Sequence, residues 1–223
     1  MSLKSRSCKI RSRPKAVVFD MDGVIVDSMP YHYLAWYEAL RPYGVRVTCF
    51  DVYSKEGEQW QKSVQGFLKK SGIDPTAKLL NEIFKSRQKI FYKYFKLHIF
   101  DRAEDTIVDL KKKGFRLALV TGTPDDLIKK ILPMRIYRMF EYIVAGNHVK
   151  KGKPHPAPYL KAAKMLGIKP SECMVVENAP YGIESAKRAG MYCVAISTSL
   201  PDEYLTKADR IVTDISDVRR IIG

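Results

Sequence analysis

Short apolar runs alternate with amphipathic stretches along most of the chain. The first run, residues 15–19, is rich in β-branched side chains, as expected for a strand that is buried on both faces. We predict further strands at residues 116–121, 141–145, 173–177, 192–196 and 210–213. Helical periodicity between these runs predicts helices over residues 103–113, 125–132, 157–166, 182–189 and 214–222. Gly114, Gly167 and Gly190 lie where three of these helices are expected to end. The alternation predicts an α/β fold with a doubly wound parallel sheet.

A long stretch between the first two strands interrupts this alternation. Residues 29–99 are too many for a single crossover, and their pattern is mostly helical. The helices predicted there are residues 31–40, 60–70 and 77–95, with breaks at residues 51–54 and 71–75. An insert directly after the first strand would lie above the carboxyl edge of the sheet, where ligands bind in such folds. We therefore predict a core domain of residues 15–28 and 100–223, and a helical inserted domain of residues 29–99.

The composition is that of an ordinary soluble globular protein, but the net positive charge is unusually high. Of 223 residues, 46% are hydrophobic and 28% are charged, and the net charge is +15. Residues 1–14 form a basic arm that we expect to be disordered. The charge would attract anions in general, and a solvated basic surface explains it better than nucleic-acid binding.

Other bulk features indicate a cytoplasmic protein. No apolar run approaches the roughly 18 residues that a membrane span requires, and the basic amino terminus lacks the apolar segment of a secretory signal. Cys8, Cys49, Cys173 and Cys193 are scattered without a Cys-x-x-Cys pair, which favours free thiols in a reducing compartment.

Polar side chains gather where the predicted strands end. They are Asp20 and Asp22 after the first strand, Thr121, Gly122 and Thr123 after the second, Lys153 in the loop after the third, and Glu177 and Asn178 after the fourth. The carboxyl ends of parallel strands meet at one edge of a sheet, so these residues are expected to share one crevice. Carboxylates suit a divalent cation such as Mg²⁺, while a hydroxyl and a lysine suit a phosphoryl group. Each of these signals is weak alone, and their joint placement carries the prediction.

These segments resemble the four motifs of the haloacid dehalogenase superfamily. The first is Asp20-Met21-Asp22-Gly23-Val24, and the others are residues 120–123, 153–156 and 175–183. The resemblance runs from about residue 15 to the carboxyl terminus and is closest to the branch of β-phosphoglucomutase, phosphoglycolate phosphatase-like enzymes and sugar phosphatases. It implies a Rossmann-like core, a mobile α-helical cap formed by the insert, and a Mg²⁺-dependent phosphatase.

The resemblance also implies a role for each motif residue. Asp20 would be the nucleophile and form an aspartyl-phosphate, and Asp22 would be the general acid and base. Thr121, Gly122 and Thr123 would hold phosphoryl oxygens, and Lys153 would offset charge. The implied Mg²⁺ ligands are the Asp20 carboxylate, the Asp22 backbone carbonyl, Glu177 and Asn178. Many relatives carry two acids in the fourth motif, so Asn178 predicts weaker Mg²⁺ binding.

The predicted cap carries two further candidates. By resemblance, His32 would position Asp22 near the hinge, although a purely structural histidine fits the pattern equally well. Residues 54–60 lie where the cap's specificity loop is expected, with Lys55 as the candidate phosphate ligand. Glu58 and Gln59 in the same loop favour a phosphatase over a mutase. The basic and aromatic run at residues 85–96 resembles a nucleic-acid signature, but one helix face of core residues explains it better.

The predicted function is a cytoplasmic, Mg²⁺-dependent phosphomonoesterase that acts on a small phosphorylated metabolite, for example a sugar phosphate. The alternatives are a β-phosphoglucomutase-like phosphomutase, and a basic nucleic-acid-binding protein with a vestigial site. We expect a monomer, with a dimer as the alternative, and neither a membrane nor a nucleic acid as partner.

Overall fold

A six-stranded parallel sheet forms the centre of the protein. The computed structural model describes residues 13–222, so most of the predicted basic arm (residues 1–14) lies outside the described residues. The strands are β1 (Ala16–Phe19), β2 (Arg116–Val120), β3 (Tyr142–Val144), β4 (Cys173–Glu177), β5 (Tyr192–Ile196) and β6 (Arg210–Val212). Their order is β3-β2-β1-β4-β5-β6, which places β1 between β2 and β4. The chain order thus reverses beside β1, and such a switch point creates a crevice at the carboxyl edge.

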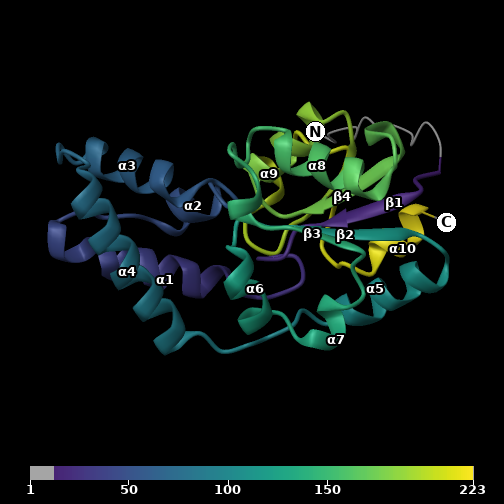
Figure 1. Ribbon diagram of the computed structural model, residues 1–223, viewed down its shortest axis with the longest axis horizontal. Helices are drawn as coiled ribbons and strands as arrows, with labels where there is room; N and C mark the ends of the chain where they lie inside the picture. Colours follow the sequence, from purple (N-terminus) through teal and green to yellow (C-terminus); the bar gives the residue numbers. More distant parts are fainter. Residues whose placement is uncertain (1–12, 223) are drawn as a thin grey trace, which may run out of the picture.

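Helices cover both faces of the sheet (Figure 1). One side holds α5 (Ala103–Lys112), α6 (Asp125–Ile131), α7 (Met134–Tyr137) and α10 (Asp217–Ile222), and the other holds α8 (Ala157–Leu166) and α9 (Pro180–Arg188). Side chains of a strand point alternately to opposite faces. Val17 and Phe19 therefore pack against the first set of helices, and Ala16 and Val18 against the second. Both faces of β1 are buried, as its continuous apolar run predicts.

The strand register brings the ends of three strands to one level. Phe19, the last residue of β1, is aligned with Leu119 of β2 and Val176 of β4. The residue that follows, Asp20, still donates its backbone N–H to the carbonyl of Val176 at 2.9 Å. The polar residues after these strands therefore begin next to one another.

The insert after β1 forms four helices beside the carboxyl edge of the sheet: α1 (Met29–Leu40), α2 (Cys49–Tyr53), α3 (Trp60–Lys70) and α4 (Ala77–Tyr94) (Figure 1). They enclose a separate apolar core that includes Leu40, Leu68 and Ile83. Two chain segments join this insert to the sheet, and they lie side by side because Asp27 N–H donates to the carbonyl of His98 at 2.9 Å.

The predicted α/β fold is confirmed, and most predicted elements match the observed ones to within about three residues. The break predicted at residues 51–54 is wrong, because α2 occupies most of it. Thr48 and Asp51 form a reciprocal capping box there, with Asp51 N–H donating to Thr48 Oγ1 and Thr48 N–H donating to Asp51 Oδ2 at 2.9 Å. The predicted domain boundaries remain predictions. Among residues 13–222, no helix has the length and apolarity needed to cross a membrane.

Candidate active site

Asp20 lies at the centre of the carboxyl edge, directly after β1, and is fully buried. One oxygen, Oδ1, accepts a hydrogen bond from Lys153 Nζ at 2.6 Å. The other, Oδ2, is buried and has no hydrogen-bond partner among the described residues. Burial raises the pKa of Asp20 well above its ordinary value, and the Lys153 ammonium opposes that rise. A further cation beside Oδ2 would also lower the pKa of Asp20, as Lys153 does.

Glu177 and Lys153 form a buried ion pair beneath Asp20. Glu177 Oε1 accepts from Lys153 Nζ at 2.5 Å and from the Tyr159 hydroxyl at 2.7 Å. Its other oxygen accepts from the backbone N–H groups of Asn178 and Ala179, at 2.9 and 3.2 Å. Burial lowers the pKa of Lys153, but the two carboxylates raise it by more, so the lysine stays a cation. Protein donors thus use four acceptor positions of Glu177, and its predicted role as a direct metal ligand stays a prediction.

Asp22 is also fully buried, and it accepts hydrogen bonds from four side chains. Ser28 and His32 donate to Oδ1 at 2.6 and 3.1 Å, and Thr121 and Thr123 donate to Oδ2 at 3.2 and 3.1 Å. Burial raises the pKa of Asp22, but the hydrogen bonds and the neighbouring His32 lower it to about 2. Asp22 is therefore an ionised acceptor in this structure.

The cap reaches Asp22 through a relay that begins at Arg87 of α4. The Arg87 guanidinium contacts Nδ1 of His32, and because arginine can only donate, Nδ1 is the acceptor. The imidazole proton is then on Nε2, from which it is donated to Asp22. Arg87 also lies over the rings of Trp36 and Phe91, with its guanidinium carbon 5.2 and 5.1 Å from the two centroids.

The predicted cap loop packs closely on the core. A Cβ on Gly57 would lie 2.2 Å from Lys153 Cδ, and a Cβ on Gly122 would lie 2.9 Å from the Gly57 Cα. Gln59 Nε2 donates to the backbone carbonyl of Lys150 at 3.0 Å. The cap is therefore closed over the strand ends, and the contact requires glycine on both sides.

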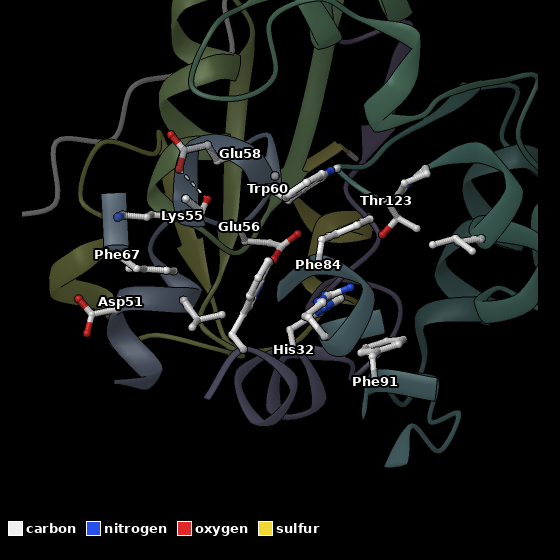
Figure 2. Close-up of a pocket in the computed structure, with 18 of the residues that line it drawn as sticks. His32, Asp51, Lys55, Glu56, Glu58, Trp60, Phe67, Phe84, Phe91 and Thr123 are labelled. Atoms are coloured by element: carbon white, nitrogen blue, oxygen red, sulfur yellow. Dashed lines mark hydrogen bonds between the residues drawn. The ribbon is translucent and has the colours of Figure 1, made fainter. Parts of the chain in front are cut away.

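Lys55, the predicted phosphate ligand of the cap loop, points elsewhere. Its ammonium lies 4.5 Å from the centroid of the Phe67 ring, on the opposite side of the loop from Glu56 (Figure 2). The structure therefore brings Asp20, Asp22, Thr121, Lys153 and Glu177 together but leaves Lys55 outside this group. Its role in phosphate binding stays a prediction.

Some residues of the site carried no usable signal in the sequence. They are Ser28, Arg87 and Tyr159. Tyr159 lies on the apolar face of α8, where it has the pattern of an ordinary core residue. Arg87 belongs to a basic run, where a solvated side chain is the ordinary expectation. Only the fold turns these three side chains toward the strand ends.

The charge and the free atoms of the site fit a divalent cation. On the core side, the buried carboxylates of Asp20, Asp22 and Glu177 face one buried ammonium, that of Lys153, so two negative charges are in excess. Asn178 Nδ2 donates to Ser199 Oγ at 2.8 Å, while its Oδ1 is buried without a partner among the described residues. Carboxylate and amide oxygens are hard ligands of the kind that Mg²⁺ takes.

Few side-chain oxygens of this region are left for a metal ion. Within residues 13–222, no three side chains of the His, Cys, Asp and Glu types are arranged to hold a metal ion. The oxygens that remain free are Asp20 Oδ2 and Asn178 Oδ1, and the Asp22 backbone carbonyl is the third predicted ligand. This donor set fits a cation that keeps several waters or takes oxygens from its substrate, as Mg²⁺ does.

Comparison with known proteins identifies the family. The sequence profile of the haloacid dehalogenase-like hydrolases matches residues 14–190, which is more than half of the chain. The chain belongs to this family. Fructose-1-phosphate phosphatase YqaB of Escherichia coli (strain K12) is 31% identical to this haloacid dehalogenase-like hydrolase over 191 residues, covering 82% of this chain and 97% of the relative. Beta-phosphoglucomutase of Bacillus subtilis (strain 168) is 29% identical over 214 residues, covering 92% and 91%.

Solved structures support the same assignment. A protein of Bacteroides vulgatus superposes on this hydrolase with a TM-score of 0.84 and 30% sequence identity, covering 94% of this chain and 88% of that one. Beta-phosphoglucomutase of Clostridium difficile shares the fold, with a TM-score of 0.80 at 22% identity and coverage of 94% and 97%. The predicted superfamily, the predicted fold and the prediction of a phosphatase of this family are confirmed.

Proposed function

We propose that this hydrolase is a Mg²⁺-dependent phosphomonoesterase that uses Asp20 as its nucleophile. The observation that carries the proposal is the state of the Asp20 carboxylate. It is fully buried, one oxygen is held by Lys153 and the other is free. A buried carboxylate next to a fixed cation, at the point where polar strand ends meet, is poised to accept a phosphoryl group.

In the first step, an oxygen of Asp20 forms a bond to phosphorus while the bond from phosphorus to the ester oxygen breaks. The leaving oxygen keeps the electron pair and takes a proton from Asp22. In the second step, the oxygen of a water molecule forms a bond to phosphorus while the bond from phosphorus to the Asp20 oxygen breaks. Asp22 takes a proton from the water, and inorganic phosphate and the free Asp20 carboxylate are the products. The low pKa of Asp22 suits the second step. For the first step, a bound phosphoryl group is a like charge that raises the pKa of Asp22.

The remaining residues hold the phosphoryl group in place. Thr121, the backbone N–H of Gly122 and the ammonium of Lys153 would surround its oxygens, which is the fixed electropositive setting that phosphoryl transfer needs. Asp20, the Asp22 backbone carbonyl and Asn178 would hold the Mg²⁺. When bound, the cation neutralises charge on the phosphoryl oxygens. His32 is a positioning residue, because it acts through Asp22.

The substrate class follows from the relatives. YqaB is named as a fructose-1-phosphate phosphatase, and a Thermotoga maritima relative, 26% identical, is named as a phosphorylated carbohydrates phosphatase. These names favour a small phosphorylated metabolite, such as a sugar phosphate, as the substrate of this chain. The second candidate is a phosphomutase, supported by the similarity to the Bacillus subtilis beta-phosphoglucomutase.

A phosphate-release screen over many phosphate monoesters, with Mg²⁺ and with EDTA, tests the proposal. We expect release of free phosphate that requires Mg²⁺ and that falls by at least about 10⁴-fold in Asp20→Asn. Asp105→Asn, at an exposed position of α5, is the matched control and should retain activity. Turnover in Asp20→Asn at the wild-type rate would contradict the mechanism, and an isomerised sugar phosphate without free phosphate would favour the mutase.

A further inference from the structure

The leaving group of the substrate could lie in an open cavity between the cap and the strand ends. The cavity is lined by Thr123, which also donates to Asp22, and by His32 on the cap side (Figure 2). It is therefore continuous with the groups that would act on the ester oxygen.

The cavity wall is richer in acidic side chains than the protein as a whole. The ionisable side chains that line it are three carboxylates and two cations: Asp51, Glu56, Glu58, Lys55 and Arg87, with His32 beside them. His32 lies between Arg87 and Asp22. Three acidic side chains thus line the cavity beside two basic ones and this histidine, in a protein whose net charge is +15.

Most of these charges are directed away from the cavity. Lys55 lies over Phe67, and Glu58 accepts a hydrogen bond from Ser63 Oγ at 2.7 Å. Asp51 accepts from Thr48 at the start of α2. The charges left to meet a ligand are therefore those of Glu56 and Arg87.

Glu56 and Arg87 both have unused hydrogen-bonding groups. The Glu56 carboxylate points toward the centre of the residues that line the cavity, and it makes no hydrogen bond or ion pair with another described residue (Figure 2). Arg87 is half-buried, and its Nε is buried without a partner among the described residues. Glu56 therefore offers a free acceptor to the leaving group, and Arg87 belongs to the same wall.

An anionic leaving group would meet an unfavourable field at Glu56. The pKa of Glu56 is raised above its ordinary value, and burial is the largest cause. The Asp22 carboxylate also raises it, while His32, Lys153 and Arg87 oppose the rise. A second phosphate or a carboxylate in the cavity would face this carboxylate in its ionised form or would require it to take up a proton. Both routes cost binding free energy, because like charges that are close together repel.

The rest of the wall suits a neutral molecule. The rings of Trp60 and Phe84 are stacked, with centroids 3.9 Å apart and an interplanar angle of 10°, and both line the cavity. Flat aromatic surface accommodates the C–H groups of a carbon chain or ring, while hydroxyl groups can donate to Glu56 and accept from Arg87.

We propose that this cavity selects phosphate monoesters whose leaving group is uncharged and carries hydroxyl groups, and that Glu56 is the specificity-determining residue that rejects a second anionic group. The proposal rests on the proposed phosphatase function and narrows its substrate. It also disfavours the phosphomutase, because a bisphosphate intermediate would place its second phosphate in this cavity.

Matched pairs of substrates test the proposal on the wild-type protein. The first pair is fructose 1-phosphate and fructose 1,6-bisphosphate. The second is 2-hydroxyethyl phosphate and phosphoglycolate, which differ by a hydroxymethyl group in place of a carboxylate. We expect kcat/KM to favour the uncharged member of each pair by at least about tenfold, since like-charge contacts cost several kcal/mol. Equal values, or a preference for the charged member, would overturn the proposal.

The variant Glu56→Gln tests the assigned residue. It keeps the shape of the side chain and removes the charge, so the preference within each pair should shrink about tenfold. Glu82→Gln makes the same change at an exposed position of α4 outside the cavity, and its preference should equal that of the wild type. An unchanged preference in Glu56→Gln would overturn the role of Glu56.

A general substrate separates failure of this proposal from failure of the phosphatase function. p-Nitrophenyl phosphate has an uncharged leaving part and should be hydrolysed by the wild type in Mg²⁺. If it is hydrolysed while the pairs show no preference, only the selectivity proposal fails. If neither p-nitrophenyl phosphate nor any member of the pairs is hydrolysed, the phosphatase function and the selectivity proposal both fail.

Discussion

The two walls of the active site are built in different ways. On the core wall, Asp22, Lys153 and Glu177 are buried, and their charged groups form hydrogen bonds with neighbouring protein groups. On the cap wall, Glu56 and Arg87 are half-buried and keep hydrogen-bonding groups without a protein partner, among aromatic side chains. The core wall is arranged for one reaction, whereas the cap wall leaves its polar groups for the substrate.

The supporting elements explain this difference. Asp22 and Glu177 lie at the ends of parallel strands, whose register is set by backbone hydrogen bonds. The cap residues belong to a loop and a helix that are joined to the sheet by two adjacent segments and that touch the core through Gly57 and Gln59.

The largest expected effect is on the free energy of unfolding, which should fall more for a substitution on the core wall than for one on the cap wall. Lys153→Met leaves two buried carboxylates without their cation, so the free energy of unfolding in EDTA should fall by about 3–5 kcal/mol. Arg87→Met removes a cation from a half-buried position, and it should cost only about 1 kcal/mol. Urea unfolding followed by circular dichroism measures both values. Equal costs would contradict the view that charge balance is stricter on the core wall.

The pH dependence of stability should have opposite signs for Asp22 of the core wall and Glu56 of the cap wall. The pKa of Asp22 is lowered from 3.8 to about 2, so the unfolded chain binds this proton more readily than the folded one. Its stabilisation, about 2 kcal/mol, is present above the ordinary pKa and is lost as the pH falls toward 2. The pKa of Glu56 is raised, so its contribution is present below the ordinary value of 4.5 and is lost as the pH rises through the raised value.

Urea unfolding between pH 2 and pH 7 measures this difference. The stability of the wild type relative to Asp22→Asn should increase with pH over the lower part of the range. Relative to Glu56→Gln, it should decrease with pH over the upper part. Two difference curves with the same sign of slope would remove the contrast between Asp22 and Glu56.

Closure of the cap should depend on Gly57. Alanine there would place a Cβ 2.2 Å from Lys153 Cδ, at a φ of 80° that L side chains rarely adopt. We expect kcat/KM for p-nitrophenyl phosphate to fall about tenfold or more, because misplacing a closing segment weakens the reaction geometry. Gly72→Ala is the matched control, since Gly72 has a φ of 74° and no atom within 4 Å of an added Cβ. A fall of the same size in both variants would assign the effect to backbone strain alone.

The smallest expected effect concerns the proposed Mg²⁺ site of the core wall. Asn178→Asp replaces a free amide oxygen with a charged one, so the half-saturating Mg²⁺ concentration should fall by up to about tenfold. Glu82→Gln, on the outer surface of the cap, should leave that concentration unchanged. Mg²⁺ titrations of phosphate release measure it. An unchanged value in Asn178→Asp would show that the amide does not limit Mg²⁺ binding.

Much of the core wall could be predicted because short sequence segments specify both its strands and the polar residues that follow them. A β-branched run followed by Asp20 and Asp22 predicts both the strand and the residues at its end, and the same holds for Thr121 after β2 and Glu177 after β4. The cap loop could not be treated in this way. Lys55 and Glu56 are neighbours in the sequence, yet one lies over Phe67 and the other faces the cavity, because loop geometry and not periodicity sets their directions.

The sequence by itself determined the family, the alternation of strands and helices, and the polar residues at the strand ends, since each follows from a periodicity or a short motif. Only the tertiary structure decided which oxygens are left without a partner among the described residues. It also decided that Tyr159 donates to Glu177, that Ser28 donates to Asp22, and that Arg87 contacts His32, 55 positions away in the sequence. The physical reason is that hydrogen bonds and buried charges depend on distance in space. That distance is set by the packing of the cap on the sheet.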